Sequence, residues 1–215
     1  EAYSGIPRAD YAERDAASMR RHLIAMGYPD RNVILITGKD AGHAGIEKYV
    51  EAWLPRNVDE HSKVFFYFSG HGAPSAESGQ AYLVPWDGDP QFLETTGYAV
   101  KRLYEKLGAL KAKSVIVAMD ACFSGAGGRS VIAQGTRPLV GKADVDVGSS
   151  GKLAVLAASG PDEVTGSDDS QGHGIFTYFL LKALNENRGQ AAVKNVFDFL
   201  SPKVRDAARR QNRDQ

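Results

Sequence analysis

The sequence predicts an α/β fold in which a mostly parallel central sheet is covered by helices on both faces. Short apolar runs alternate along the chain with longer segments whose apolar residues recur at helical spacing. The main runs are apolar at successive positions, which is typical of strands that are buried on both faces. With 215 residues, the chain is long enough for one substantial domain with its own core.

The expected helices are recognised by apolar residues three or four positions apart and by residues that end a helix. The first has Ala16, Met19 and Leu23 on one face and ends at Gly27. In the last, Pro202 is expected to kink or split the helix. In chain order, we expect helices at 9–28, 44–54 (closed by Pro55), 97–110, 174–186 and 192–210.

The expected strands are short runs rich in β-branched and aromatic residues, bounded by turn residues. The run 32–38 is β-branched and ends at a glycine, so we expect a buried strand there. In chain order, we expect strands at 32–38, 62–70, 81–87, 114–120 and 152–159.

One long stretch interrupts this alternation. Residues 124–151 are rich in Gly and Ser, show no periodicity and carry Arg129, Arg137 and Lys142. A loop of this length inside a compact domain is usually functional or disordered. Since another apolar run follows it, we expect a single domain over 1–215, made of 1–123, a mobile linker at 124–151, and 152–215.

The composition excludes several classes of function. Lys plus Arg and Asp plus Glu both total 26, so no overall field attracts nucleic acid or an anionic membrane. The single cysteine excludes an internal disulfide and a zinc site built from cysteines. No apolar run approaches the roughly 20 residues of a membrane span, and no signal peptide is recognisable. A reducing compartment fits the single cysteine, but the localisation stays open.

Polar residues follow two of the apolar runs at the point where each run ends. His71 follows 62–70, and Cys122 follows 114–120. If these strands are parallel neighbours, both side chains lie at the carboxyl edge of the sheet, where α/β folds bind ligands. A nearby imidazole lowers the pKa of a thiol and accepts its proton, so the pair suits a nucleophile and its base. The backbone N–H groups of Gly72 and Cys122 are candidates for an oxyanion hole.

Each residue taken alone has a simpler interpretation. A cysteine at the end of a strand is often a small buried hydrophobe, and a histidine there is often a turn residue. The two occur together, 51 positions apart, and in caspases the histidine precedes the cysteine by about 50 positions. This spacing favours the catalytic interpretation.

The motifs 69-SGHG-72 and 120-DACFSG-125 resemble those of caspase-like cysteine peptidases, most closely metacaspases and their bacterial relatives. The resemblance covers nearly the whole chain, from 15-DA-16 to 172-GHGIFTYFL-180. It implies a caspase-like fold, protein or peptide substrates and a cysteine endopeptidase with a His71–Cys122 dyad that acts through a thioester acyl-enzyme. It also hints at a monomer.

The expected substrate pocket is acidic. Caspases carry Gln-Ala-Cys, whereas this chain has Asp120 two positions before the cysteine. The resemblance implies that Asp120, Asp15 and Ser69 line a pocket for a substrate Arg or Lys. A guanidinium is held well by two carboxylates, and a substrate aspartate is repelled by them. For a further acidic residue we select Asp168, with Glu163 and Asp169 as alternatives.

The resemblance also gives the basic residues of the 124–151 linker a meaning. Arg129, Arg137 and Lys142 are candidate self-cleavage positions for a peptidase that cuts after basic residues. A substrate-gating loop that is never cut is the other interpretation, and both stay open.

Two features depart from the family pattern. An apolar strand is expected before 1-EAYSGIPRAD-10 and is absent, so we expect a fragment or processed form of a longer, multidomain chain. Many metacaspases need calcium, but here the segment after Cys122 has no acidic residue. Asp87 and Asp89 are better explained by a turn, and no metal is assigned. The histidines at 22, 43, 61 and 173 lack ligand spacing and are interpreted as surface or capping residues.

Three other functions are kept as alternatives. The first is a related peptidase of the legumain or separase kind with a different pocket. The second is a catalytically idle caspase-like adaptor or scaffold. The third is a receiver-like signalling domain that uses Asp120, which leaves the SGHG motif unexplained.

Overall fold

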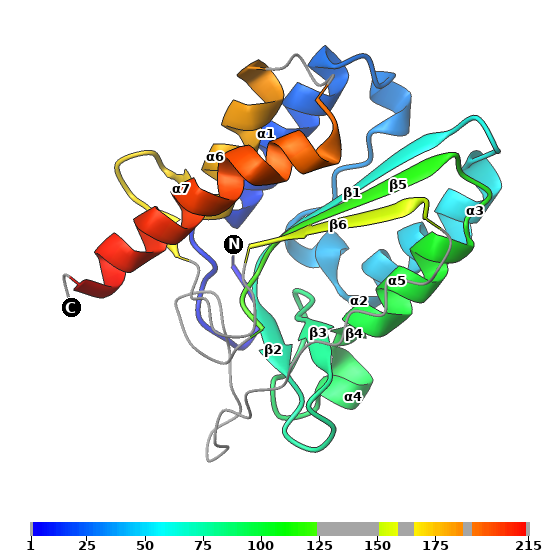
Figure 1. The fold of residues 1–215 in the computed structure, drawn as a ribbon. Coiled ribbons are helices and arrows are strands. Elements are labelled where there is room, and N and C mark those ends of the chain that lie inside the picture. The colour runs from blue at the N-terminus through cyan, green and yellow to red at the C-terminus, as the bar shows by residue number, and fades with distance from the viewer. Residues whose placement is uncertain (1, 124–150, 159–165, 187–190, 214–215) are drawn as a thin grey trace.

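The computed structural model describes residues 2–123, 151–158, 166–186 and 191–213. Its centre is a parallel sheet of β1 (Lys63–Ser69), β5 (Ser114–Asp120) and β6 (Leu153–Ala157), in the order β1-β5-β6 (Figure 1). Three of the expected strands are therefore confirmed. The register pairs the last residues of the first two strands, Ser69 with Asp120.

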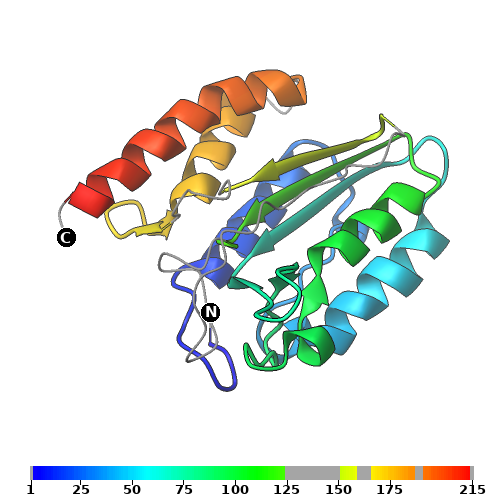
Figure 2. The same ribbon diagram turned by 60° about the horizontal axis from the view of Figure 1, so that its bottom comes forward.

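Helices cover both faces of this sheet, as predicted. One face is covered by α1 (Ala12–Ala25), α6 (Ile175–Glu186) and α7 (Val193–Arg213) (Figures 1 and 2). The other face is covered by α2 (His43–Glu47), the π-type turn η3 (Lys48–Trp53), α3 (Leu54–Asn57) and α5 (Val100–Ala109). Side chains of β1 alternate between the two apolar clusters: Phe65 and Tyr67 pack in the first, and Phe66 and Phe68 in the second.

A small antiparallel sheet follows β1. It consists of β2 (Gly72–Pro74), β3 (Ala81–Leu83) and β4 (Tyr98–Ala99), with the short helix α4 (Leu93–Thr96) beside it. The expected strand at 81–87 is thus shorter and belongs to this sheet. A hairpin of β7 (Ser167–Asp168) and β8 (His173–Gly174) leads into α6. Two 3-10 turns, η1 (Asp30–Asn32) and η2 (Gly38–Ala41), lie between α1 and α2.

The prediction of a buried strand at 32–38 is wrong for the described structure. Residues 33–37 join η1 to η2 in no strand, although the backbone of Val33 is extended. Ile34 and Leu35 are 41% and 40% exposed. The physical reason is that a strand needs a neighbour for its backbone hydrogen bonds, and none of the described strands lies beside this segment.

Two prolines do not end or divide their helices as expected. Pro55 does not close its helix, because it lies in the first turn of α3, where proline is tolerated, and α3 continues to Asn57. Pro202 lies inside α7 without splitting it, and Val196, Leu200 and Val204 stay buried on one face of that helix.

Within the described ranges, no helix has the length and apolarity needed to cross a bilayer.

Candidate active site

His71 and Cys122 occupy matched positions just beyond the ends of two neighbouring strands. β1 ends at Ser69 and β5 ends at Asp120, and these two residues are partners in the parallel register. The backbone N–H of Gly70 donates to the carbonyl of Asp120 (3.2 Å), which extends the pairing one step further. His71 and Cys122 each follow two residues after the paired ends, so both lie at the carboxyl edge of the sheet, and both are buried.

The ring of His71 is oriented by the N-terminal segment. Its Nε2 lies 2.9 Å from the carbonyl oxygen of Pro7, which can only accept, so Nε2 carries the hydrogen. In the neutral imidazole the lone pair is then on Nδ1, the nitrogen that acts as a base. The backbone N–H of His71 donates to the hydroxyl of Tyr3 (2.9 Å), and the two rings lie 4.9 Å apart. Neither Pro7 nor Tyr3 was among the residues predicted for the site.

Gly72 is in close contact with the segment that carries the cysteine. A Cβ atom at position 72 would lie 2.7 Å from the ring of Phe123 and 2.8 Å from the carbonyl oxygen of Cys122. Only glycine therefore allows β2 to approach this segment so closely. The ring of Phe123 therefore lies against the side of Gly72 from which a Cβ atom would project.

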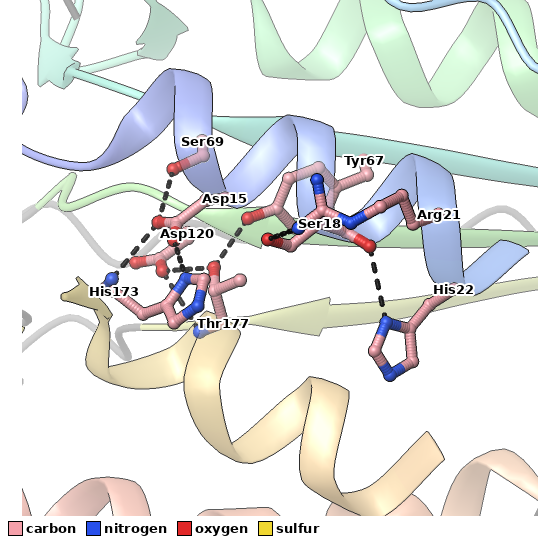
Figure 3. Close-up of polar contacts among 10 residues, drawn as sticks. Asp15, Ser18, Arg21, His22, Tyr67, Ser69, Asp120, His173 and Thr177 are labelled. Atoms are coloured by element: carbon pink, nitrogen blue, oxygen red, sulfur yellow. Dashed lines mark hydrogen bonds and ion pairs between the residues drawn. The ribbon is translucent and has the colours of Figure 1, made fainter. Parts of the chain in front are cut away.

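Asp15 links α1 to the segment before α6. Its Oδ1 accepts a hydrogen bond from Nδ1 of His173 (2.6 Å), and its Oδ2 accepts from the N–H of Gly174 (3.1 Å) and the hydroxyl of Ser69 (3.2 Å) (Figure 3). The carboxylate is completely buried. The structure thus brings Asp15 and Ser69 together.

Asp120, the last residue of β5, has its side chain beside the first turn of α6. Its Oδ2 accepts hydrogen bonds from the backbone N–H (3.1 Å) and the hydroxyl (2.6 Å) of Thr177, in the first turn of that helix (Figure 3). The positive end of the helix dipole stabilises a carboxylate in this place. The hydroxyl of Thr177 also contacts the hydroxyl of Tyr67 on β1. Asp15 and Asp120 therefore both accept hydrogen bonds from residues 173–177. This part of the sheet edge thus has two buried acidic side chains.

His173 is a member of this site rather than a surface or capping residue. It is half-buried and holds Asp15, while the other histidines contact carbonyl or exposed groups: His22 the carbonyl of Ser18, and His43 that of Thr96. A signal was present in the sequence, because the tripeptide Gly-His-Gly occurs at both 70–72 and 172–174.

The remaining acidic candidates are engaged elsewhere. Asp168 lies opposite His173 in the β7–β8 hairpin, and its Oδ1 accepts from the N–H (3.0 Å) and hydroxyl (2.6 Å) of Ser170, within the same turn. Asp169 accepts from the hydroxyl of Tyr11 (2.9 Å). Glu163 and the candidate self-cleavage residues Arg129, Arg137 and Lys142 lie outside the described residues.

The two aspartates considered as metal ligands have local roles. Oδ1 of Asp87 accepts from the backbone N–H of His43 (2.8 Å), the first residue of α2, and Oδ1 of Asp89 accepts from the N–H of Gln91 (2.9 Å). Among the residues that the structure describes, no three His, Cys, Asp or Glu side chains form a group that could hold a metal ion.

Comparisons with known proteins agree with this architecture. A family model described as the caspase domain of peptidase family C14 matches residues 1–215. A search of curated proteins found no match. Among solved structures, the chain is similar to protein GSU0716 from Geobacter sulfurreducens, with a TM-score of 0.62 and 16% identity over 87% of this chain and 77% of that one. At this identity the likeness concerns the fold alone. The match over the full length shows that the chain belongs to the caspase domain family of cysteine peptidases.

Proposed function

We propose that the chain is a metacaspase-like endopeptidase that cleaves after Arg or Lys, with Cys122 as nucleophile and His71 as base. The observation that carries the proposal is the matched position of the two residues, each two residues beyond the paired ends of β1 and β5, with His71 held by Pro7 so that Nδ1 has the lone pair. This is the nitrogen that a neighbouring thiol needs for deprotonation.

The proposed reaction has two halves. His71 takes the thiol proton, and the sulfur of Cys122 attacks the carbonyl carbon of the scissile bond to give a tetrahedral oxyanion. The N–H groups of Gly72 and Cys122 are the proposed donors to that oxyanion. The imidazolium then protonates the leaving amine as the C–N bond breaks, which leaves a thioester. Water, deprotonated by His71, hydrolyses the thioester and regenerates the thiol.

The proposed preference for Arg and Lys rests on charge. Asp15 and Asp120 are buried carboxylates at the same edge as the dyad, and Ser69 is hydrogen-bonded to the first of them. A substrate cation that reaches this edge gains charge-assisted hydrogen bonds, whereas a substrate carboxylate is repelled. The carboxylate of Asp168 is a weaker candidate for this pocket, because its own turn already uses it.

Turnover also requires the site to open. Cys122 is 0% exposed, and the ring of Phe123 covers Gly72. A substrate carbonyl therefore reaches the sulfur only after the groups that bury Cys122 have moved. Self-cleavage after Arg129, Arg137 or Lys142, in the segment that follows Phe123, is the proposed opening event.

The buried thiol is the one observation that favours a second candidate function, a catalytically idle caspase-like adaptor. In an adaptor, Cys122 would be a small buried hydrophobe with no need of access. The two functions differ in what happens to the thiol when a substrate analogue is offered.

The deciding experiment uses fluorogenic peptides that end in Arg, Lys, Asp or Asn, each with and without calcium, before and after limited proteolysis. We expect cleavage after Arg and Lys only, with no activity in Cys122→Ala. A peptide aldehyde or chloromethyl ketone ending in Arg is expected to label Cys122 in the same preparation. Absence of both cleavage and labelling in every condition would support the adaptor instead. Cleavage after Asp or Asn would refute the proposed pocket but not the dyad.

A further inference from the structure

Tyr3 joins His71 to the small antiparallel sheet. The hydroxyl of Tyr3 accepts the backbone N–H of His71 (2.9 Å), and the centroids of the two rings lie 4.9 Å apart. The next N–H along the chain, that of Ser4, donates to the carbonyl of Trp86 (3.1 Å). Tyr3 also packs against an apolar cluster that includes residues of β2, β3 and α4, namely Ala73, Tyr82, Val84 and Leu93. One side chain therefore connects a packed cluster with the proposed base.

The backbone of residue 71 is held on both sides. Its N–H donates to Tyr3, and its carbonyl accepts from the N–H of Val84 (3.0 Å). The ring of His71 is held separately, by the carbonyl of Pro7. A buried N–H that loses its acceptor is costly, so the backbone shifts to find another one. Since His71 is buried, removal of the Tyr3 hydroxyl is expected to move residue 71.

The first glycine of the SGHG motif is explained by the same hydroxyl. Gly70 does not have the left-handed backbone that favours glycine, so its conformation does not require this residue. What excludes a side chain is space, because a Cβ atom at position 70 would lie 2.5 Å from the hydroxyl oxygen of Tyr3 and 3.0 Å from the ring of Phe68. Gly70 therefore leaves open the space through which Tyr3 reaches the N–H of His71.

We infer that Tyr3 is a positioning residue of the proposed reaction, and that it sets the place of the His71 imidazole through the backbone of residue 71. The inference rests on the proposed function, since His71 is a base only in that reaction. The thiol proton of Cys122 passes to Nδ1 of His71, and this transfer depends on where the ring lies. Loss of the Tyr3 hydroxyl is therefore expected to slow the chemical step and to leave substrate binding unchanged.

The first test variant is Tyr3→Phe, which removes the hydroxyl and keeps the ring. The matched control is Tyr104→Phe, because Tyr104 is a buried tyrosine of α5 that belongs to a different apolar cluster. Steady-state kinetics use the peptide ending in Arg, in the preparation that tests the proposed function. Nitrogen NMR of the His71 ring shows which nitrogen carries the hydrogen, and this measurement does not need an active enzyme.

For Tyr3→Phe we expect kcat to fall at least about fivefold with KM unchanged, whereas Tyr104→Phe changes both by less than about twofold. In the wild-type protein we expect the His71 signals of a ring with its hydrogen on Nε2, as the hydrogen bond to Pro7 requires. In Tyr3→Phe that bond weakens because residue 71 has moved, so we expect a mixture of the two tautomers. A role in stability alone would change neither the kinetics nor the ring signals.

Gly70→Ala tests the same contact from the other side, and it keeps the test valid if Tyr3→Phe does not fold. Its methyl group displaces the hydroxyl of Tyr3, so we expect the same fall in kcat and the same mixture of tautomers. In the double variant the hydroxyl is already absent. The two changes then share one cause, and we expect an effect no larger than that of the stronger single variant.

Three results would overturn the inference: unchanged His71 signals in Tyr3→Phe, a rise in KM with kcat unchanged, or effects of the two changes that multiply in the double variant. Failure of the proposed function gives a different result. If the wild-type protein cleaves no peptide while Tyr3→Phe still alters the His71 tautomer, the peptidase reaction is refuted and the role of Tyr3 in positioning the imidazole is supported.

Discussion

The ring of His173 and the carboxylate of Asp15 are joined by a hydrogen bond of 2.6 Å between Nδ1 and Oδ1, although the residues are 158 positions apart. Asp15 is completely buried, whereas the side chain of His173 is 15% exposed. The other oxygen of the carboxylate accepts from Gly174 and Ser69. The histidine therefore holds the proposed pocket acid in place between α1 and β8.

Replacing His173 by alanine is expected to lower the free energy of unfolding by about 2 kcal/mol, because a buried charged acceptor loses one of its donors. The matched control is His22→Ala, since the ring of His22 contacts the backbone carbonyl of Ser18 (3.3 Å) rather than a carboxylate, and a loss below about 1 kcal/mol is expected. Urea unfolding at pH 7 measures both. If both variants lost the same free energy of unfolding, the hydrogen bond to Asp15 would contribute no more than the contact of His22 with a backbone carbonyl.

The placement of His71 and Cys122 at one edge of the sheet could be predicted from the sequence because that prediction needed only local signals. An apolar run that ends in a polar residue marks the end of a strand, and parallel strands place their carboxyl ends at one edge. The contacts of Pro7 with His71, and of Thr177 with Asp120, could not be predicted in this way. They join residues 64 and 57 positions apart, and no periodicity in either segment reports on the other.

The wrong prediction at 32–38 has a related cause. A β-branched run indicates that a segment suits a pleated surface, but it carries no information about whether a partner lies beside it. The described structure keeps the extended backbone at Val33 and the opposite-facing packing of Val33 and Ile36, but not the pairing. Local preference was therefore predicted correctly, and only the tertiary partner was not.

If Asp120 belongs to the proposed pocket, changing it to asparagine is expected to reduce kcat/KM for Arg peptides at least about a hundredfold, because the proposed pocket loses one buried negative charge. Thr177→Val separates positioning from charge. It removes the hydroxyl donor to Asp120 (2.6 Å) but keeps the backbone donor and the carboxylate. For this variant we expect a loss of about 1–2 kcal/mol in unfolding free energy and a smaller kinetic effect. Steady-state kinetics and urea unfolding test both; a larger kinetic loss in Thr177→Val would contradict the charge argument.

Substituting alanine for Gly72 is expected to destabilise the protein by about 1–3 kcal/mol. The new Cβ would lie 2.7 Å from the ring of Phe123 and 2.8 Å from the carbonyl oxygen of Cys122, so one segment has to shift. Gly108→Ala in α5 is the control, because no described atom outside its own helix turn lies within 4 Å of the place that a methyl group would take. Alanine favours helix, and there we expect a gain of about 0.5–1 kcal/mol. Thermal unfolding measures the stability of both variants. If Gly72→Ala left the stability unchanged, the close contact at Gly72 would be disproved.

Glu51 is expected to make stability depend on pH. Burial alone would raise the pKa of its carboxyl, but hydrogen bonds from Tyr98, Lys106 and Arg102 outweigh burial and leave the pKa below its ordinary value of 4.5. A group whose pKa is lowered by folding stabilises the protein above its unfolded pKa, and that contribution is lost as pH falls through the folded value. Glu51→Gln is therefore expected to lower the free energy of unfolding by about 1–3 kcal/mol at pH 7 and progressively less below pH 4.5.

The control is Glu47→Gln, which changes a 44% exposed partner of Arg102 and is expected to lower the free energy of unfolding by less than about 1 kcal/mol. Urea unfolding at pH 7 and in steps below pH 4.5 tests this, and a pH-independent cost of Glu51→Gln would show that its charge is not what stabilises the fold.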